Sequence, residues 1–208
     1  IVYGLIEGAF KNNGKEDPAT DDWSMKCINI IIRSRTEQVM YDFKIGFVEF
    51  EKTKIEQKVV EKVLRTLTAI NNVGPNKIGY VIVGIADNEE AAKAYAEKYS
   101  EKYYMESGFA VVGVEHDARA VGMNLDRYTH TVKEYIKNSH LLPEDYKQHI
   151  LINMKTPLLY SHQLIIFKTE FDKPVTFDNE YYIREFSDVR KLSTEEMPML
   201  FENYYSKR

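Results

Sequence analysis

The pattern of apolar and polar positions predicts several regular elements along the chain. Residues 55–70 are predicted to form an amphipathic helix, because apolar side chains recur there every three or four positions. Residues 39–45 alternate instead, with Tyr41 and Phe43 among the apolar positions, which is typical of a half-buried strand. The β-branched run at 78–85 predicts a strand that is covered on both faces. These three segments carry the clearest secondary-structure signals in the sequence.

Weaker patterns predict the remaining elements. The apolar run at 24–33 fits a short helix or a buried strand, and periodicity does not separate the two. Ser193 and Glu196 have the spacing of a capping box that opens a last helix. Further helices are expected at 89–103, at 126–138 and from Pro143 onward, and further strands at 109–114, 164–171 and 181–184.

Helices and strands therefore mix without a strict βαβ alternation. This mixture predicts an α/β, or mixed α+β, fold in which strands and helices form the layers of one domain. We expect that domain to span residues 24–208, after an irregular lead-in at 1–23. The first residue is Ile1 rather than Met, which suggests a piece of a longer protein that is truncated upstream.

Composition narrows the class of protein. Of 208 residues, 44% are hydrophobic, which is enough for a sizeable core. The single cysteine, Cys27, excludes an internal disulfide and is expected to be buried and inert, and no close set of Cys and His suits structural zinc. The sequence has no apolar run of ~20 residues that would span a membrane and no signal peptide. We therefore expect a cytoplasmic protein without a membrane partner.

Charge bears on nucleic-acid binding. The formal net charge is −4 and the sequence pI is about 5.8. A passive nucleic-acid binder usually has an excess of Lys and Arg, so this balance argues against one. It does not argue against a nuclease, because carboxylates that hold divalent cations are neutralised in use.

Three segments, in order, resemble the core domain of the Schlafen family, which in bacteria is also called AlbA-like. Residues 37–44 read EQVMYDFK and resemble that family's E-x-x-x-x-E-F-K segment, with Asp42 in place of the second Glu. Residues 69–87 resemble its Ala-Asn loop and the apolar strand that ends in G-[IV]-x-D. Residues 181–184, Ser187 and the helix expected to run through Leu200 and Phe201 resemble its closing segment and helix. The resemblance implies a Schlafen-like layered domain that carries an inserted helix at about 88–108.

The resemblance also identifies candidate catalytic residues. In nuclease members of this family three acidic residues form the catalytic cluster, and the matching positions are Glu37, Asp42 and Asp87. Carboxylates select Mg²⁺ or Mn²⁺ over zinc, and these ions neutralise the charge that develops when a phosphodiester is cleaved. For Glu37 to meet Asp42, it must precede the strand, since residues five apart on one strand point to opposite faces.

Basic and polar residues nearby are candidates for substrate contact. Lys44 lies on the same strand face as Asp42, so it is expected either to contact a phosphate or to pair with Asp42. Asn72 and Arg184 are weaker candidates for contact with nucleic acid. His116, between two acidic neighbours, is expected in a surface loop, because alternation along a strand would separate the three side chains.

These features give three hypotheses about function. The first is a metal-dependent endoribonuclease that acts on tRNA or other structured RNA, with DNA as the alternative substrate and a role in stress or phage defence. The second is a non-catalytic nucleic-acid-binding or regulatory module of a larger ATPase, helicase or transcription regulator. The third is a protein-interaction module that uses tyrosine-rich surfaces at 95–104 and 128–146. Flanking domains of the same protein are expected partners, and oligomerisation is left open.

Overall fold

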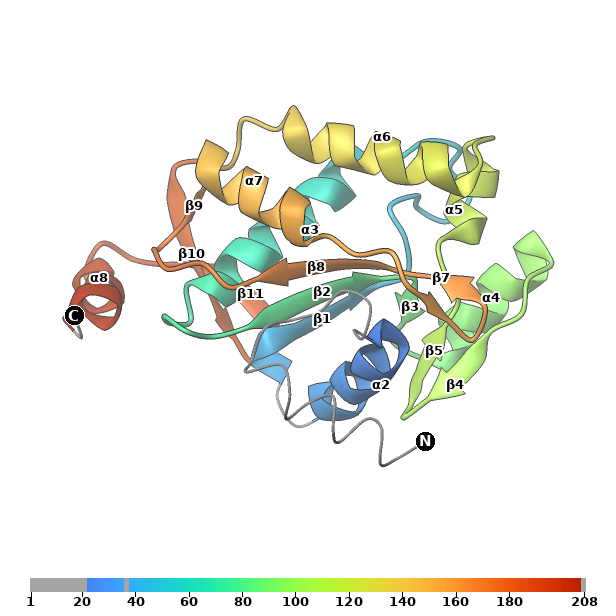
Figure 1. The fold of residues 1–208 in the computed structure, drawn as a ribbon, viewed down its shortest axis with the longest axis horizontal. Helices are drawn as coiled ribbons and strands as arrows, with labels where there is room; N and C mark the ends of the chain where they lie inside the picture. Colours follow the sequence, from blue (N-terminus) through green and yellow to red (C-terminus); the bar gives the residue numbers. More distant parts are fainter. Residues whose placement is uncertain (1–21, 36–37, 207–208) are drawn as a thin grey trace.

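The computed structural model describes residues 22–35 and 38–206, and its fold is the mixed α/β type that the sequence predicts (Figure 1). The central sheet has the strand order β1-β2-β8, with β1 parallel and β8 antiparallel to β2. Its strands are Tyr41–Lys44 (β1), Gly79–Val83 (β2) and Ile165–Thr169 (β8). Helix α3 (Gln57–Asn71) connects β1 to β2, because parallel neighbours cannot be joined by a tight hairpin.

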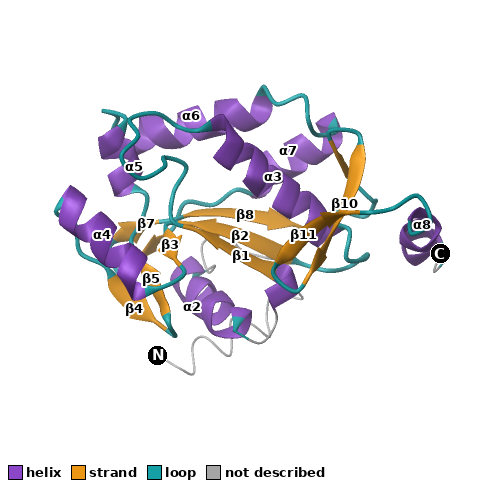
Figure 2. Ribbon diagram, turned by 180° about the vertical axis from the view of Figure 1, so that it is seen from behind, coloured by secondary structure: helices purple, strands orange, loops and turns teal. Residues whose placement is uncertain are grey.

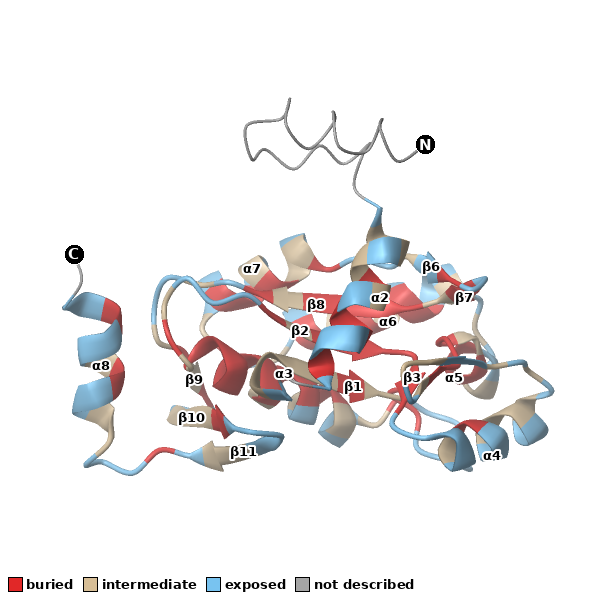
Figure 3. Ribbon diagram, turned by 90° about the horizontal axis from the view of Figure 1, so that it is seen from below, coloured by how far each residue is buried: buried red, intermediate tan, exposed pale blue. Residues whose placement is uncertain are grey.

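Helices cover both faces of this sheet (Figure 2). Helices α3 and α7 (Glu144–Asn153) lie on one face, with α6 (Leu125–Lys137) packed against both, and α2 (Trp23–Ser34) lies on the other. Strand β2 belongs to both cores, since Val81 packs on the α3 side and Ile82 on the α2 side. The prediction of a strand covered on both faces is therefore confirmed. Figure 3 shows that buried residues follow β2, β8 and α3.

The ambiguous run at 24–33 is helical. The Asp22 side chain caps α2 by accepting from the Ser24 and Met25 N–H groups at 3.0 and 3.2 Å. The inward face of α2 includes Cys27, which is fully buried, as expected. Burial raises the pKa of the Cys27 thiol to about 12, so the thiol is protonated at neutral pH. This thiol is therefore a small apolar core group.

Two glycines shape the path from α3 to the candidate site. A Cβ atom at Gly79 would lie 2.0 Å from Ile70 Cγ2, so only glycine lets β2 start this close to α3. Gly84 has a φ of +106°, a conformation that favours glycine, and it ends β2. The chain then leaves the central sheet at Ile85–Ala86 (β3), which brings Asp87 out of the interior.

Beyond Gly84 the chain forms a side unit around a second sheet. Its elements are β3, α4 (Glu89–Tyr99), β4 (Tyr104–Glu106) and β5 (Phe109–Val111), with the strand order β3-β5-β4. Residues 88–108 thus hold α4 and β4. Helix α4 ends earlier than predicted, because Ser100 adopts a left-handed conformation and the chain reverses. Strand β5 is also shorter than predicted, and a helix, α5 (Glu115–Ala120), follows it.

A third sheet and the last helix close the chain. The sheet has the order β11-β10-β9, packs against α3, and consists of Thr176–Phe177 (β9), Glu180–Glu185 (β10) and Asp188–Lys191 (β11). Helix α8 (Met197–Tyr205) lies at the end of the molecule beyond this sheet (Figure 1). The Tyr204 hydroxyl attaches α8 to the body by donating to the Asn71 carbonyl.

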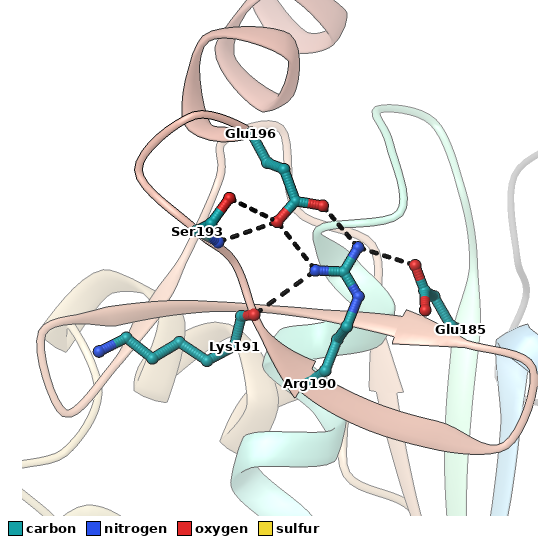
Figure 4. Close-up of polar contacts among 5 residues, drawn as sticks. All are labelled: Glu185, Arg190, Lys191, Ser193 and Glu196. Atoms are coloured by element: carbon teal, nitrogen blue, oxygen red, sulfur yellow. Dashed lines mark hydrogen bonds and ion pairs between the residues drawn. The ribbon is translucent and has the colours of Figure 1, made fainter.

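The segment before α8 is organised by Glu196 (Figure 4). Its carboxylate accepts from the Ser193 backbone N–H and hydroxyl at 2.9 Å each, and from Arg190 Nη2 at 2.6 Å. Arg190 and Ser193 together lower the pKa of Glu196 to about 2. The predicted Ser193–Glu196 pair forms, but the capping box is wrong, because the helix begins after Glu196 rather than at Ser193.

Burial also affects the prediction of a tyrosine-rich contact surface at 128–146. Tyr128 and Tyr146 are fully buried, so residues 128–146 do not offer these tyrosines as a contact surface. The pair β6 (Leu158–Leu159) and β7 (His162–Gln163) forms a short ribbon that the sequence did not predict. Within residues 22–35 and 38–206, no helix is both long enough and apolar enough to cross a membrane.

Candidate functional site

Four of the six candidate site residues meet at one pocket. A pocket of about 310 Å³ lies beside β1, the edge strand of the central sheet, and Asp42, Lys44, Asp87 and Arg184 line it. They come from β1, from the segment after β3, and from β10. The β1 pocket therefore combines two carboxylates with two cations, drawn from three different sheets or their ends.

Asp42 is held by both cations. Arg184 Nη2 donates to Asp42 Oδ1 at 3.0 Å, and Lys44 Nζ contacts Asp42 Oδ2. The side chains of Asp42 and Arg184 are only 14% and 3% exposed, so this ion pair is largely desolvated. The two cations also bind the strand itself, since Arg184 Nη2 donates to the Tyr41 carbonyl at 3.0 Å and Lys44 Nζ to the Phe43 carbonyl at 2.9 Å.

Lys44 was expected either to contact a phosphate or to pair with Asp42, and the structure shows the pairing. Strand alternation puts Lys44 on the same face as Asp42, as predicted, and the two side chains pair. Lys44 still lines the pocket and is 20% exposed, so a ligand in the pocket can reach its ammonium group. Ammonium and guanidinium groups are the usual partners of phosphate oxygens.

Asp87 differs from Asp42 because no hydrogen bond or ion pair from residues 22–35 or 38–206 holds its side chain. It is exposed as a residue, yet the pocket walls remove part of its solvent. This desolvation raises the pKa of Asp87, and the negative charge of Asp42 raises it further, while Lys44 and Lys62 act in the opposite direction. The pKa of Asp87 thus rises mainly because the pocket walls desolvate its carboxylate, and the nearby charge of Asp42 is a smaller cause.

The third acidic candidate, Glu37, lies outside the described residues. The 3₁₀ turn Gln38–Met40 precedes β1, so the chain turns before the strand begins. Among residues 22–35 and 38–206, no group of three His, Cys, Asp or Glu side chains could hold a metal ion. Asp42 and Asp87 have the oxygen ligands that suit Mg²⁺ or Mn²⁺, but they form a pair rather than a complete set.

Asn72 has a structural role, which corrects the expectation that it contacts nucleic acid. Its residue is 1% exposed at the end of α3. Its amide nitrogen donates to the Val175 and Tyr182 carbonyls, and its amide oxygen accepts from the Val175 N–H, all at 2.8 Å. The side chain joins α3 to the third sheet and has no group left for a ligand in the β1 pocket.

His116 is also not where the sequence predicted it. Instead of a surface loop, it lies in α5 with 2% exposure and packs edge-on against Tyr95. Its Nε2 atom lies 3.1 Å from Asp117 Oδ1. The other oxygen of Asp117 accepts from the Phe47 and Val48 N–H groups, at 2.5 and 3.2 Å.

The Tyr128 hydroxyl completes this buried Asp117 cluster by donating to Asp117. Burial and the nearby Asp117 charge raise the pKa of Tyr128, so its hydroxyl stays protonated. Glu115 does not join the cluster; its Oε1 accepts from the Gln163 N–H at 2.6 Å. Burial raises the pKa of Glu115, but its contacts with His162 and Gln163 outweigh this, and the pKa is lowered overall.

Comparison with known proteins supports the fold alone. No protein-family model matches this sequence, and a search of curated proteins finds no match. Among solved structures, the chain is similar to the crystal structure of the DIP2311 protein from Corynebacterium diphtheriae, with 12% identity and a TM-score of 0.50. The similarity covers 88% of this chain and 29% of that one. The chain thus spans less than a third of that protein.

Proposed function

We propose that this domain binds RNA in the β1 pocket and cleaves it as a metal-dependent endoribonuclease of the Schlafen type. One observation carries the proposal: Asp42 and Asp87, two of the three positions that resemble the family's catalytic acids, line one pocket. The residues are far apart in sequence and meet because the chain leaves the central sheet at Gly84. Two cations line the same pocket, and this combination suits a phosphodiester.

The pocket residues divide into two roles. Lys44 and Arg184 would bind and orient phosphate oxygens, because they are the cations that line the pocket. Asp42 and Asp87 would hold Mg²⁺ or Mn²⁺, with Glu37 as the candidate third ligand. Such an ion, when bound, stabilises charge on the phosphate and activates water. The mutual repulsion of Asp42 and Asp87 supports this role, since a divalent cation would relieve it.

A second candidate function is RNA binding without cleavage, in a regulatory module of a larger protein. The pairing of Asp42 favours it: Arg184 and Lys44 already occupy both carboxylate oxygens. A metal ion would have to bind Asp42 beside these two cations or displace one of them. In this function the pocket would use Lys44 and Arg184 for phosphate contact, and the carboxylates would position those two cations.

Cleavage of total tRNA by the purified chain in Mn²⁺ tests the proposal. We expect cleavage by the wild type, no cleavage in EDTA, and a loss on the order of a hundredfold or more in Asp87→Asn. Glu90→Gln is the matched control, because Glu90 is an exposed carboxylate in α4 that does not line the pocket. Cleavage by Asp87→Asn at the wild-type rate would refute the assignment. RNA binding without cleavage by any form would establish the second function.

A further inference from the structure

A second pocket adjoins the β1 pocket at Lys44. It has a volume of about 380 Å³ and shares Lys44 with the β1 pocket. Two lysines from α3, Lys58 and Lys62, line it together with the aromatic residues Phe50 and Tyr95. We call the five residues Lys44, Phe50, Lys58, Lys62 and Tyr95 the lysine groove. Since the Lys44 side chain borders both pockets, a ligand in one pocket lies next to the other.

The lysines of this groove are available to a ligand. Lys58 and Lys62 lie one turn apart on α3 and are both exposed. In the part of the chain that the structure describes, neither forms an ion pair, whereas Lys44 is paired with Asp42. Only one carboxylate, Glu49, lines the same pocket. Two unpaired ammonium groups beside one carboxylate favour an anionic ligand.

The electric field of the groove reaches the β1 pocket. The positive charge of Lys62 opposes the rise in the pKa of Asp87, although the two residues line different pockets. Over both pockets the lining includes four cations and three carboxylates, on a chain whose formal net charge is −4. The excess over both pockets is one positive charge, and it lies in the second pocket, where three lysines and one carboxylate favour an anionic ligand.

The aromatic residues add a second kind of contact. Phe50 is 41% exposed, so its ring is accessible to a ligand in this pocket. The ring of Tyr95 is tilted against it, with ring centroids 5.1 Å apart. Lys98 Nζ lies 4.5 Å from the Phe50 ring centre, so another cation borders the aromatic pair. Exposed rings beside cations are how proteins hold the bases and backbone of single strands.

We propose that the lysine groove binds a single-stranded stretch of RNA next to the β1 pocket. Lys58 and Lys62 bind phosphates, and Phe50 stacks on a base. This inference rests on the proposed function for RNA as the ligand, but not on cleavage. It deepens that function because it specifies an unpaired stretch, such as a loop or an end, as the part of the RNA that enters. Duplex RNA does not expose base faces for stacking on Phe50.

Binding measured in EDTA tests this inference separately from cleavage. Fluorescence anisotropy would give the affinity of a labelled oligouridylate, and of an RNA duplex of the same length, over a range of NaCl concentrations. The test variants are Lys58→Gln/Lys62→Gln and Phe50→Leu. The control is Lys133→Gln/Lys155→Gln, which removes the same charge from two exposed lysines that do not line the groove. Circular dichroism would check that every variant is folded.

The phosphate and stacking contacts have different signatures. The Lys58/Lys62 double variant should weaken oligouridylate binding on the order of tenfold and reduce the slope of log affinity against log salt by about 1.4, at ~0.7 per phosphate. Phe50→Leu should weaken binding about fivefold or more without changing that slope. The control should match the wild type, and the duplex should bind more weakly than the oligouridylate.

Several results would overturn the inference. It fails if the Lys58/Lys62 variant matches the control, if Phe50→Leu binds like the wild type, or if the duplex binds as tightly as the oligouridylate. Cleavage of tRNA by the wild type together with any of these results refutes the lysine groove alone. The expected losses in binding, without cleavage in Mn²⁺, refute the nuclease and leave the groove standing.

Discussion

The structure has one carboxylate in a buried cluster, Asp117, and another in an open pocket, Asp42, and the two differ in the groups that donate to them. In the buried cluster, Asp117 is 0% exposed, and its fixed donors are backbone N–H groups and the hydroxyl of Tyr128. In the β1 pocket, Asp42 is paired with the side chains of Lys44 and Arg184, which line open space. Backbone donors cannot move away to admit a ligand, whereas long charged side chains can.

The comparison shows what separates a structural carboxylate from a candidate functional one. Asp117 joins the loop after β1 to α6, since Phe47 and Tyr128 both donate to it. Among the described residues, no hydrogen bond or ion pair connects the Asp87 side chain to another element, and desolvation disfavours its charged form. A residue kept in an unfavourable environment is a stronger functional candidate than one whose environment satisfies it. Substitution of Asp117 should therefore lower the free energy of unfolding, whereas substitution of Asp87 should raise it slightly.

The largest effect is expected for Asp117→Ala. The change leaves the Phe47 and Val48 N–H groups and the Tyr128 hydroxyl without an acceptor in the interior, which should cost about 4 kcal/mol in the free energy of unfolding. Urea denaturation would measure the loss. Asp126→Ala, at an exposed position in the first turn of α6, should stay within about 0.5 kcal/mol of the wild type. Equal losses in both variants would contradict the role of the Asp117 cluster.

An intermediate effect is expected for Asp42→Ala. Arg184 would lose its carboxylate partner while its side chain stays 3% exposed, so we expect a loss of about 2 kcal/mol in the free energy of unfolding. Asp42→Asn keeps an acceptor for Arg184 and should lose less. Urea denaturation of both variants would separate them. If Asp42→Ala is as stable as the wild type, the ion pair does not stabilise the edge of the sheet.

The smallest effect, with the opposite sign, is expected for Asp87→Asn. The pKa of Asp87 is raised in the folded protein, so its ionised form opposes folding, and stability is lost as the pH rises through that pKa. The variant should therefore melt slightly above the wild type at neutral pH. This difference should disappear as the pH falls to the ordinary pKa of 3.8. Melting curves over pH, with Glu90→Gln as control, would measure it. A variant that melts below the wild type at neutral pH would contradict this assignment.

Long elements could be predicted from the sequence, and short ones could not. The periodicity of α3 and the apolar run of β2 follow from their burial, so both were predicted with small errors at their ends. Strands β6, β7 and β9 have two residues each, too few to show alternation. Helix α5 has six residues, four of them polar, so it likewise carries no apolar stripe with helical spacing.

The candidate site was accessible to sequence reasoning only in part. Strand alternation predicted that Asp42 and Lys44 share a face. The pairing of Asp42 with Arg184 joins residues 142 positions apart, and no local pattern encodes such a contact. Asn72 illustrates the opposite error: a polar residue in a family-like segment resembled a ligand contact, while its partners, more than 100 positions away, make it a structural bridge.

The contacts of Lys44 and Arg184 with the backbone of β1 also bear on self-association. Among the described strands only β2 pairs with β1, so the outer side of β1 would otherwise present free carbonyl groups to a strand from another molecule. Arg184 and Lys44 occupy the carbonyls of Tyr41 and Phe43 on that side. The same two cations that line the β1 pocket thus protect the sheet from edge-to-edge aggregation, so their loss would lower solubility.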